Sequence, residues 1–132
     1  MKVIKPSTIS DATLFSSTVS ELSNPEDYYL VNGLGSLVAP AVWSSASAYS
    51  AGERVWRSTT HRIYEALTAI AAGPTNVAPE TMIEGVATTP TWLQVGPTNK
   101  WAMFDGEVAS ATKDGASITV VLNTSQINSV AL

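Results

Sequence analysis

The chain of 132 residues contains no cysteine and few charged residues. Without cysteine there is no disulfide, no thiolate nucleophile and no zinc site of the usual structural kind, so stability must come from packing or assembly. Charged residues make up 14% of the sequence, against roughly 25% in an average soluble domain. Serine, threonine and alanine must therefore cover much of the surface, which favours strands, turns and close packing between subunits.

Basic clusters and long apolar runs are also missing. The formal net charge is −4, from seven Lys plus Arg against eleven Asp plus Glu, whereas nucleic-acid binding needs clustered basic residues. The longest apolar stretches, such as residues 69–72, are far too short to span a bilayer. The opening Met1 to Pro6 has no apolar segment behind its lysines. We therefore expect no nucleic-acid partner, no membrane insertion and no classical secretion signal.

Residues suited to catalysis or metal binding are scarce. His61 is the one histidine of the sequence, and no other ligand is spaced to join it, so we expect a solvated turn histidine. The carboxylates stand mostly beside Gly or Pro, without the facing pair that a glycosidase needs. A Gly-x-Ser-x-Gly elbow is absent, and Gly33-Leu34-Gly35 lacks the third glycine of a dinucleotide loop. The sequence thus predicts no enzyme, no catalytic residue, no cofactor and no metal.

The composition divides the chain into three zones. Residues 1–40 are rich in Ser, Thr, Pro and Gly and read as an irregular arm with short strands, whose apolar patch at Tyr28 to Val31 precedes an Asn-Gly turn signal. Residues 41–105 hold all four tryptophans, which indicates a compact β-module with an aromatic core. Residues 106–132 form the third zone. The fold class expected is mainly β.

The third zone alternates apolar and polar residues around Asp114-Gly115, with Ile118, Val120 and Leu122 on one face. This pattern predicts a β-hairpin with a tight turn. The chain then ends on a second apolar run, residues 127–132. Because two strands leave a sheet face uncovered, we expect them to pair with another chain in a cyclic homo-oligomer, or with further residues of a longer polypeptide.

The second zone has the clearest local pattern. We expect a turn at residues 49–52, a short strand at 54–57, a hairpin loop at 58–61 and a returning strand at 62–67. Four aromatic residues then lie close enough to form the core of a module that has no disulfide. These core residues are Trp43, Tyr49, Tyr64 and Trp92.

The same segment resembles a known kind of module. Its order is Trp43, then Tyr49-x-x-Gly-Glu-x-Val, Ile63-Tyr-x-Ala, Gly73 with a proline six residues later, and a closing Trp92. This order is similar to the small chitin-binding β-modules of carbohydrate-binding families 5 and 12. Such modules usually place further aromatic residues just after the Tyr-x-Ala strand, where an exposed ring stacks on a sugar. Here residues 67–72 contain none.

A second resemblance continues the first. The run from Trp92 to Asp105, which includes Gly-Pro-Thr-Asn-Lys-Trp-Ala-Met-Phe-Asp, resembles virion proteins of tailed bacteriophages, and so does the opening from Lys2 to Ala12. In those proteins the module leads into a β-sandwich or jelly-roll-like domain longer than the residues remaining here. The resemblance therefore implies the start of such a domain at residues 106–132, a shortened chain, and assembly into a virion in the cytoplasm of a bacterial host.

Two functions from different classes follow. The first is a structural subunit of a phage tail, collar or baseplate, an adaptor between symmetric virion components whose partners are other virion proteins and copies of itself. The alternative is a receptor-directed module of a tail fibre or baseplate that binds cell-surface glycan. Trp56 and Trp101 are the candidate residues for contact with a glycan or a partner. Large aromatic side chains are preferentially buried or placed at interfaces, and this favours the structural role.

Overall fold

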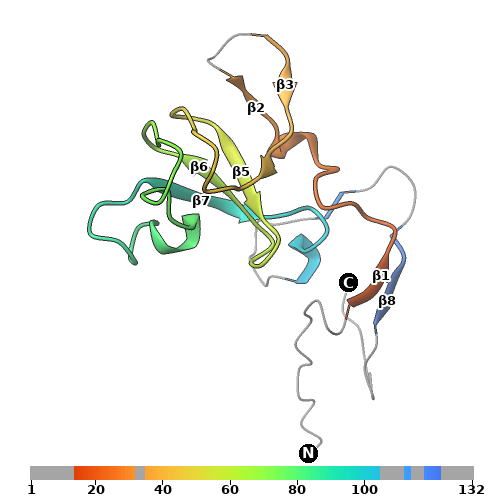
Figure 1. Cartoon of the computed structure of the whole chain (residues 1–132). Helices are drawn as coiled ribbons and strands as arrows, with labels where there is room; N and C mark the ends of the chain where they lie inside the picture. The colour runs from red at the N-terminus through yellow and green to blue at the C-terminus, as the bar shows by residue number, and fades with distance from the viewer. Residues whose placement is uncertain (1–13, 32–34, 105–111, 114–117, 123–132) are drawn as a thin grey trace, which may run out of the picture.

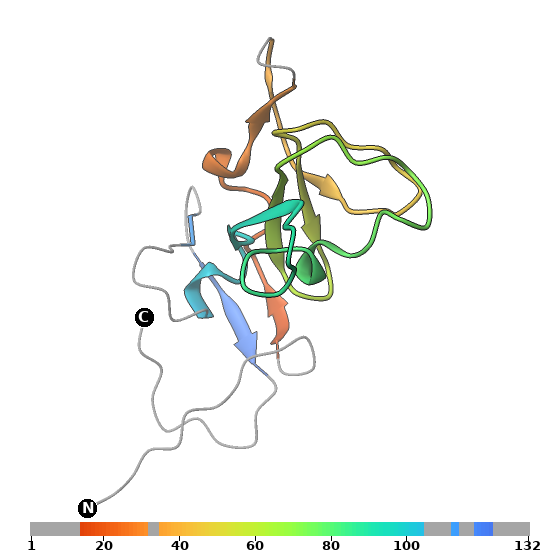
Figure 2. The same cartoon turned by 90° about the vertical axis from the view of Figure 1, so that its left-hand side faces the viewer.

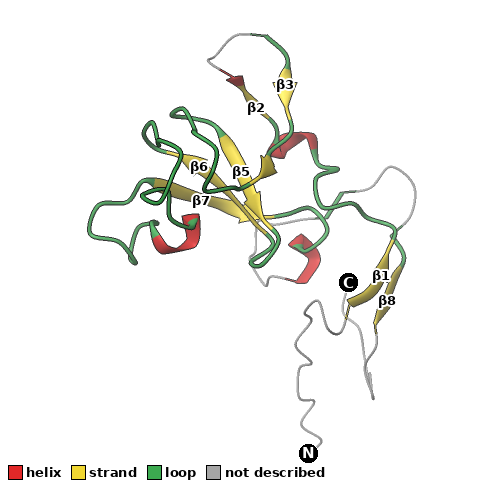
Figure 3. Cartoon of the chain, in the orientation of Figure 1, coloured by secondary structure: helices red, strands yellow, loops and turns green. Residues whose placement is uncertain are grey.

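The computed structural model describes residues 14–31, 35–104, 112–113 and 118–122. Within these residues the chain is mainly β, as the sequence predicts (Figure 1). The strands form one four-stranded sheet in the order β4-β5-β6-β7 and two separate pairs, β1-β8 and β2-β3. The described helical segments are short 3-10 turns (Figure 3), and none of them is long or apolar enough to cross a membrane.

The four-stranded sheet is built around a hairpin. Strands β5 (Arg54–Arg57) and β6 (Arg62–Ala66) pair antiparallel across the turn at residues 58–61, which matches the predicted strands to within one residue. Strand β7 (Trp92–Pro97) adds antiparallel to β6, with a bulge between Ile63 and Tyr64. The short strand β4 (Ala41–Val42) adds parallel to β5 on the other side.

Both faces of this sheet hold buried side chains. Residues paired directly across two strands lie on the same face. The pairs Val55–Tyr64 and Ala66–Trp92 therefore share one face, which forms the aromatic core. Their neighbours in the strands, including the pairs Trp56–Ile63 and Arg54–Glu65, lie on the opposite face. Ile63 is 0% exposed there, whereas Leu93, paired with Glu65 on that face, is 46% exposed, so this face is covered in part.

The aromatic core contains the four aromatic residues named from the sequence. Tyr49, Tyr64 and Trp92 are buried with Val55 and Ala66, and Trp43 packs against this cluster. The rings of Tyr49 and Trp92 meet edge to face, with 5.3 Å between centroids. The Tyr49 hydroxyl donates to the carbonyl oxygen of Ser44 at 2.9 Å and accepts from the amide of the same residue at 2.7 Å. The buried phenol thus has partners for both of its hydrogen-bonding roles.

The N-terminal arm is not part of the four-stranded sheet. Its strand β1 (Leu14–Ser17) pairs antiparallel with β8 (Val120–Leu122), near the other end of the chain. The arm then continues as an irregular segment that ends in a 3-10 turn, η1 (Pro25–Asp27). We call residues 14–28 the front arm. It crosses the second face of the sheet, because the Arg54 guanidinium on that face donates to the carbonyl oxygens of Glu26 and Asp27.

The β2–β3 hairpin joins the front arm to the module. Strand β2 (Tyr29–Leu30) pairs antiparallel with β3 (Leu37–Val38). In both views the hairpin and the β1–β8 pair project from opposite ends of the molecule (Figures 1 and 2). The chain therefore runs from the front arm through the β2–β3 pair into β4 of the four-stranded sheet.

The predicted C-terminal hairpin lies mostly outside the described residues, which omit 105–111, 114–117 and 123–132. The interface expected of residues 127–132 and the start of a sandwich domain lie outside them too. In the part that is described, β8 pairs with β1 of the arm.

Candidate functional site

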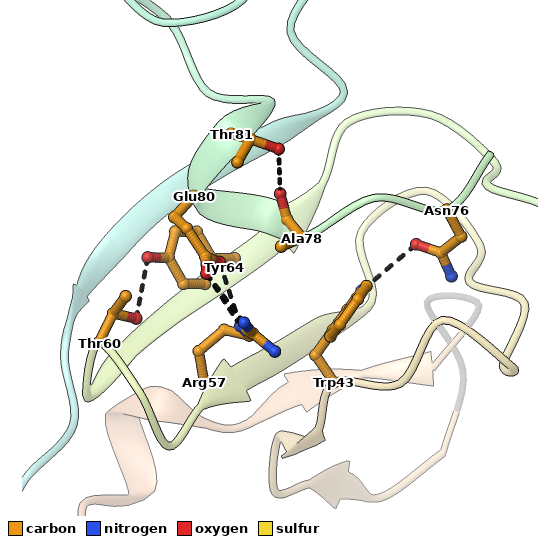
Figure 4. A network of polar contacts seen from close by, with 8 residues as sticks. All are labelled: Trp43, Arg57, Thr60, Tyr64, Asn76, Ala78, Glu80 and Thr81. Atoms are coloured by element: carbon orange, nitrogen blue, oxygen red, sulfur yellow. Dashed lines mark hydrogen bonds and ion pairs between the residues drawn. The ribbon is translucent and has the colours of Figure 1, made fainter. Parts of the chain in front are cut away.

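Trp43 is fixed at a corner of the module by charged and polar neighbours (Figure 4). The Arg57 guanidinium lies over its indole ring, 4.6 Å from the centroid. Glu80, in the 3-10 turn η3 (Pro79–Thr81), accepts two hydrogen bonds from Arg57, at 2.9 Å from Nη2 and 3.1 Å from Nε. This paired geometry orients the guanidinium, and the cation stabilises the ring by a cation–π contact. One face of Trp43 is thus occupied within the chain.

The indole N–H of Trp43 is also used, by Asn76. It donates to the Asn76 Oδ1 at 3.3 Å, while the Asn76 Nδ2 donates to the carbonyl oxygen of Ser47 at 2.8 Å and lies near two further serine carbonyls. The Asn76 residue is 2% exposed. A buried amide with its donors and acceptor paired fixes the loop of residues 44–48 against the core.

A second buried asparagine, Asn99, joins three segments of the chain. Its backbone N–H donates to the carbonyl oxygen of Glu21 at 2.9 Å, and its Nδ2 donates to the Ser23 hydroxyl at 2.5 Å. The side chain also pairs with the backbone of Lys113, at 2.8 Å to its carbonyl and 2.7 Å from its amide. Asn99 is 1% exposed. The front arm and the segment at residues 112–113 are therefore tied to the end of β7 by one side chain.

The carboxylate of Glu21 completes this joint. It accepts hydrogen bonds from the Thr98 hydroxyl and, at 3.1 Å, from the indole N–H of Trp101. Thr98 is 0% exposed and Trp101 7%. Hydrogen bonds to an ionised acceptor are stronger than neutral ones, and more so where water is excluded. We call the set of residues that makes this joint the arm clamp: Glu21, Ser23, Thr98, Asn99 and Trp101.

His61 contacts the arm clamp, so the expectation of a solvated turn histidine is wrong. The residue does lie in the β5–β6 turn, with a φ of 51°, but its side chain is only 16% exposed. The imidazole stacks on Trp101 with 4.2 Å between ring centroids, and Nδ1 is 3.4 Å from the Glu21 carboxylate. The turn sequence gave no sign of these contacts, because both partners are distant in the chain.

The two tryptophans named for glycan or partner contact have different environments. Trp101 is buried between His61 and Phe104, whose ring centroid is 6.0 Å away. Its face is therefore covered by the chain itself. Trp56 is half-buried on the second face of the sheet, opposite Ile63. Of these two rings, Trp56 is the one with accessible surface for another molecule.

The front arm also holds a carboxylate without a full set of partners. Burial raises the pKa of Asp27 to about 6, against the opposing effect of the Arg54 charge. Its Oδ2 is enclosed and has no hydrogen-bond partner among the described residues. The neighbouring Glu26 is exposed and paired with Lys113 at 2.5 Å, which lowers its pKa. Asp27 is thus the group whose ionisation opposes docking of the arm.

Sequence reasoning missed Asn76, Asn99, Thr98 and Glu21. A signal was present for the first three. The tetrapeptide Gly-Pro-Thr-Asn occurs twice, at residues 73–76 and 96–99, and both copies end in a buried asparagine. Glu21 stands in a stretch of serines with no motif around it, and nothing local distinguishes it.

The described part of the chain holds no group of three His, Asp or Glu side chains that could bind a metal ion. No protein-family model, no curated protein and no solved structure matches this chain. The described residues form a joint: a β-module, an arm that crosses it, and a buried polar clamp between them.

Proposed function

We propose that the chain is a structural subunit of a bacteriophage tail, collar or baseplate, acting as an adaptor between symmetric virion components. The arm clamp is the observation that supports this most. The run that resembles virion proteins, residues 92–105, supplies Thr98, Asn99 and Trp101, and these residues tie separate segments together. An adaptor needs a joint that holds an arm at a fixed angle to a rigid module.

The surface of the chain also suits contact with other proteins. Residues 28–52 include no charged residue, and several aliphatic side chains near both edges of the sheet are exposed. Exposed aliphatic side chains are the kind of surface that protein partners cover. The exposed side chains are Leu30, Leu37, Val38, Val42, Leu67, Leu93 and Val95.

The proposal can be tested on phage particles. Antibodies against the purified chain should label the tail, collar or baseplate of particles produced by a host that carries the gene, in immunogold electron microscopy. Particles from a deletion of the gene provide the control for specificity. If purified virions carry no label and contain no peptide of this chain by mass spectrometry, the proposed role is wrong.

The alternative is glycan binding at Trp56. This residue supports it because part of its indole remains accessible on a β-strand, and an exposed ring can stack on a sugar face. A single half-buried ring with a weak site would still be useful if several copies were displayed on one particle. Binding of chitooligosaccharide to the purified chain, compared with a Trp56→Ala variant, separates this alternative from the structural role.

A further inference from the structure

The β2–β3 hairpin is an unusual way to connect an arm to a module. Leu30, Leu37 and Val38 are 47%, 56% and 41% exposed, so its aliphatic side chains face solvent. An isolated two-stranded hairpin is at best marginally stable in water. The connection is therefore easy to open, by separation of β2 from β3.

The front arm is held mainly by polar contacts. Val19, at 4% exposed, is the one buried hydrophobic residue among described positions 18–28. The other attachments are hydrogen bonds and ion pairs: the arm clamp, the Arg54 contacts with residues 26 and 27, and the pairing of β1 with β8. Water can replace such hydrogen bonds when the arm leaves. The arm also contacts the buried Trp101, so an arm that has left is stable only where it docks again.

We propose that the front arm is exchanged between copies of this chain. Glu21 and Ser23 of one copy then occupy the clamp formed by Thr98, Asn99 and Trp101 of another copy, and β1 pairs with the second copy's β8. Every contact of the front arm is made again, so exchange costs little beyond association itself.

Exchange also accounts for the exposed hairpin. Once opened, the connection must cross from one copy to the next, and Leu30, Leu37 and Val38 gain a neighbouring surface on which to pack. Their burial then favours the exchanged form over the closed monomer, because apolar burial contributes about 25 cal/mol per Å². The second copy is the occupant for which a complementary site is already visible, since this chain carries both the arm and the clamp.

The inference does not rest on the virion role. Arm exchange is a property of the purified chain and can be measured without phage particles. A negative result for exchange therefore leaves the proposed function standing, and a chain missing from virions leaves exchange standing.

Cysteine pairs give a direct test, because the natural chain has no cysteine. Thr18 and Thr119 face each other across the extension of the β1–β8 pair, where the Thr18 N–H donates to the Thr119 carbonyl at 3.0 Å. Both residues are exposed. Because the Thr18 hydroxyl accepts a hydrogen bond from the Thr119 N–H at 3.0 Å, circular dichroism first checks that each single variant keeps the fold. The two single variants, carrying tags of different size, are unfolded, mixed, refolded together and oxidised. A Thr88→Cys variant replaces Thr119→Cys as the control, because Thr88 is exposed in the loop between η3 and β7, which lies at the other end of the molecule from the β1–β8 pair (Figure 1).

Exchange predicts a shift of the mixed sample to a mixed-tag dimer on a denaturing gel, and no such dimer with the Thr88→Cys control. Light scattering of the natural chain should then give the mass of an oligomer. The double variant Thr18→Cys/Thr119→Cys tests for the closed monomer, in which the disulfide would form entirely within one chain. A monomeric mass, complete intrachain linkage or an oligomer without the mixed-tag dimer would each overturn the proposal.

Discussion

The two copies of Gly-Pro-Thr-Asn fold into different roles. In the first copy, Asn76 pairs with Trp43 and with serine carbonyls of a loop about thirty residues away, all inside the module. In the second, Asn99 pairs with Ser23 and Lys113, and so connects the module to the arm and to a later segment. The threonines differ as well: Thr75 is exposed, whereas Thr98 is fully buried and donates to Glu21.

This comparison shows what a short motif determines. In both copies the asparagine is buried and its amide finds backbone groups that would otherwise lack partners. The identity of those groups depends on which segment passes nearby, and the tetrapeptide does not set that. The same sequence therefore stabilises a module in one place and a joint in the other.

Among the variants that test this comparison, loss of a core aromatic residue should reduce the free energy of unfolding most. Trp92 is 1% exposed and lies on the core face beside Ala66. The Trp92→Ala variant should lose about 3–5 kcal/mol of unfolding free energy, since it leaves a large cavity. Chemical denaturation followed by circular dichroism measures this loss. A loss below about 1 kcal/mol would mean that the ring does not organise the core.

Replacing Asn76 should weaken the whole module. Asn76→Ala removes the partner of the Trp43 indole N–H and of the Ser47 carbonyl, and each unsatisfied buried group costs about 1–3 kcal/mol. The unfolding midpoint of the module should fall. Thr75→Ala, in the same tetrapeptide but exposed, is the matched control and should leave the midpoint unchanged.

Replacing Asn99 should instead release the arm. In Asn99→Ala the contacts with Ser23 and Lys113 are lost, but the aromatic core is untouched. Amide hydrogen exchange should become faster in residues 18–28 and remain slow in β5 and β6. The buried Thr98 offers a second variant, Thr98→Ala, with the same expected pattern. Equal loss of protection in the arm and in the module would contradict the distinction between the two tetrapeptides.

Asp27 should make stability depend on pH. Its pKa of about 6 lies above the ordinary value of 3.8, so the folded chain binds the proton more tightly than the unfolded chain. The contribution of Asp27 therefore becomes more favourable as the pH falls from 7.5 to 5, and an Asp27→Asn variant should lack this part of the change. Denaturant midpoints of both proteins at the two pH values test it. Identical pH dependence would show that the carboxyl is not held in a buried environment.

Glycan binding should show the smallest effect. Residues 67–72 lack aromatic side chains, and Trp101 is covered by the chain, so calorimetry with chitooligosaccharides should give no measurable heat of binding. Trp56→Ala should then behave as the natural chain does. Saturable micromolar binding that this substitution abolishes would instead favour the receptor-binding alternative.

The sequence predicted the parts of the fold that depend on near neighbours. Residues 54–57 and 62–66 show the pattern of two strands around a turn, and the aromatic residues of the core all fall within one segment of the sequence. The hairpin and the core could therefore be located. The two-residue strand β4 is too short to show any periodicity. The arm clamp was missed because its hydrogen bonds join positions 76 to 80 residues apart, through side chains that are also common in ordinary turns.

The pairing of β1 with β8 has a consequence for biosynthesis. A hydrogen bond in this pair spans 101 positions of the sequence, so β1 leaves the ribosome long before its partner exists. At about 5–20 residues per second, the delay is roughly 5–20 seconds, whereas a hairpin such as β5–β6 forms in microseconds. During translation the module strands therefore form while β1 still waits for β8. A β1 that has left the ribosome therefore stays unpaired until a β8 is available, whether from its own chain or from another copy.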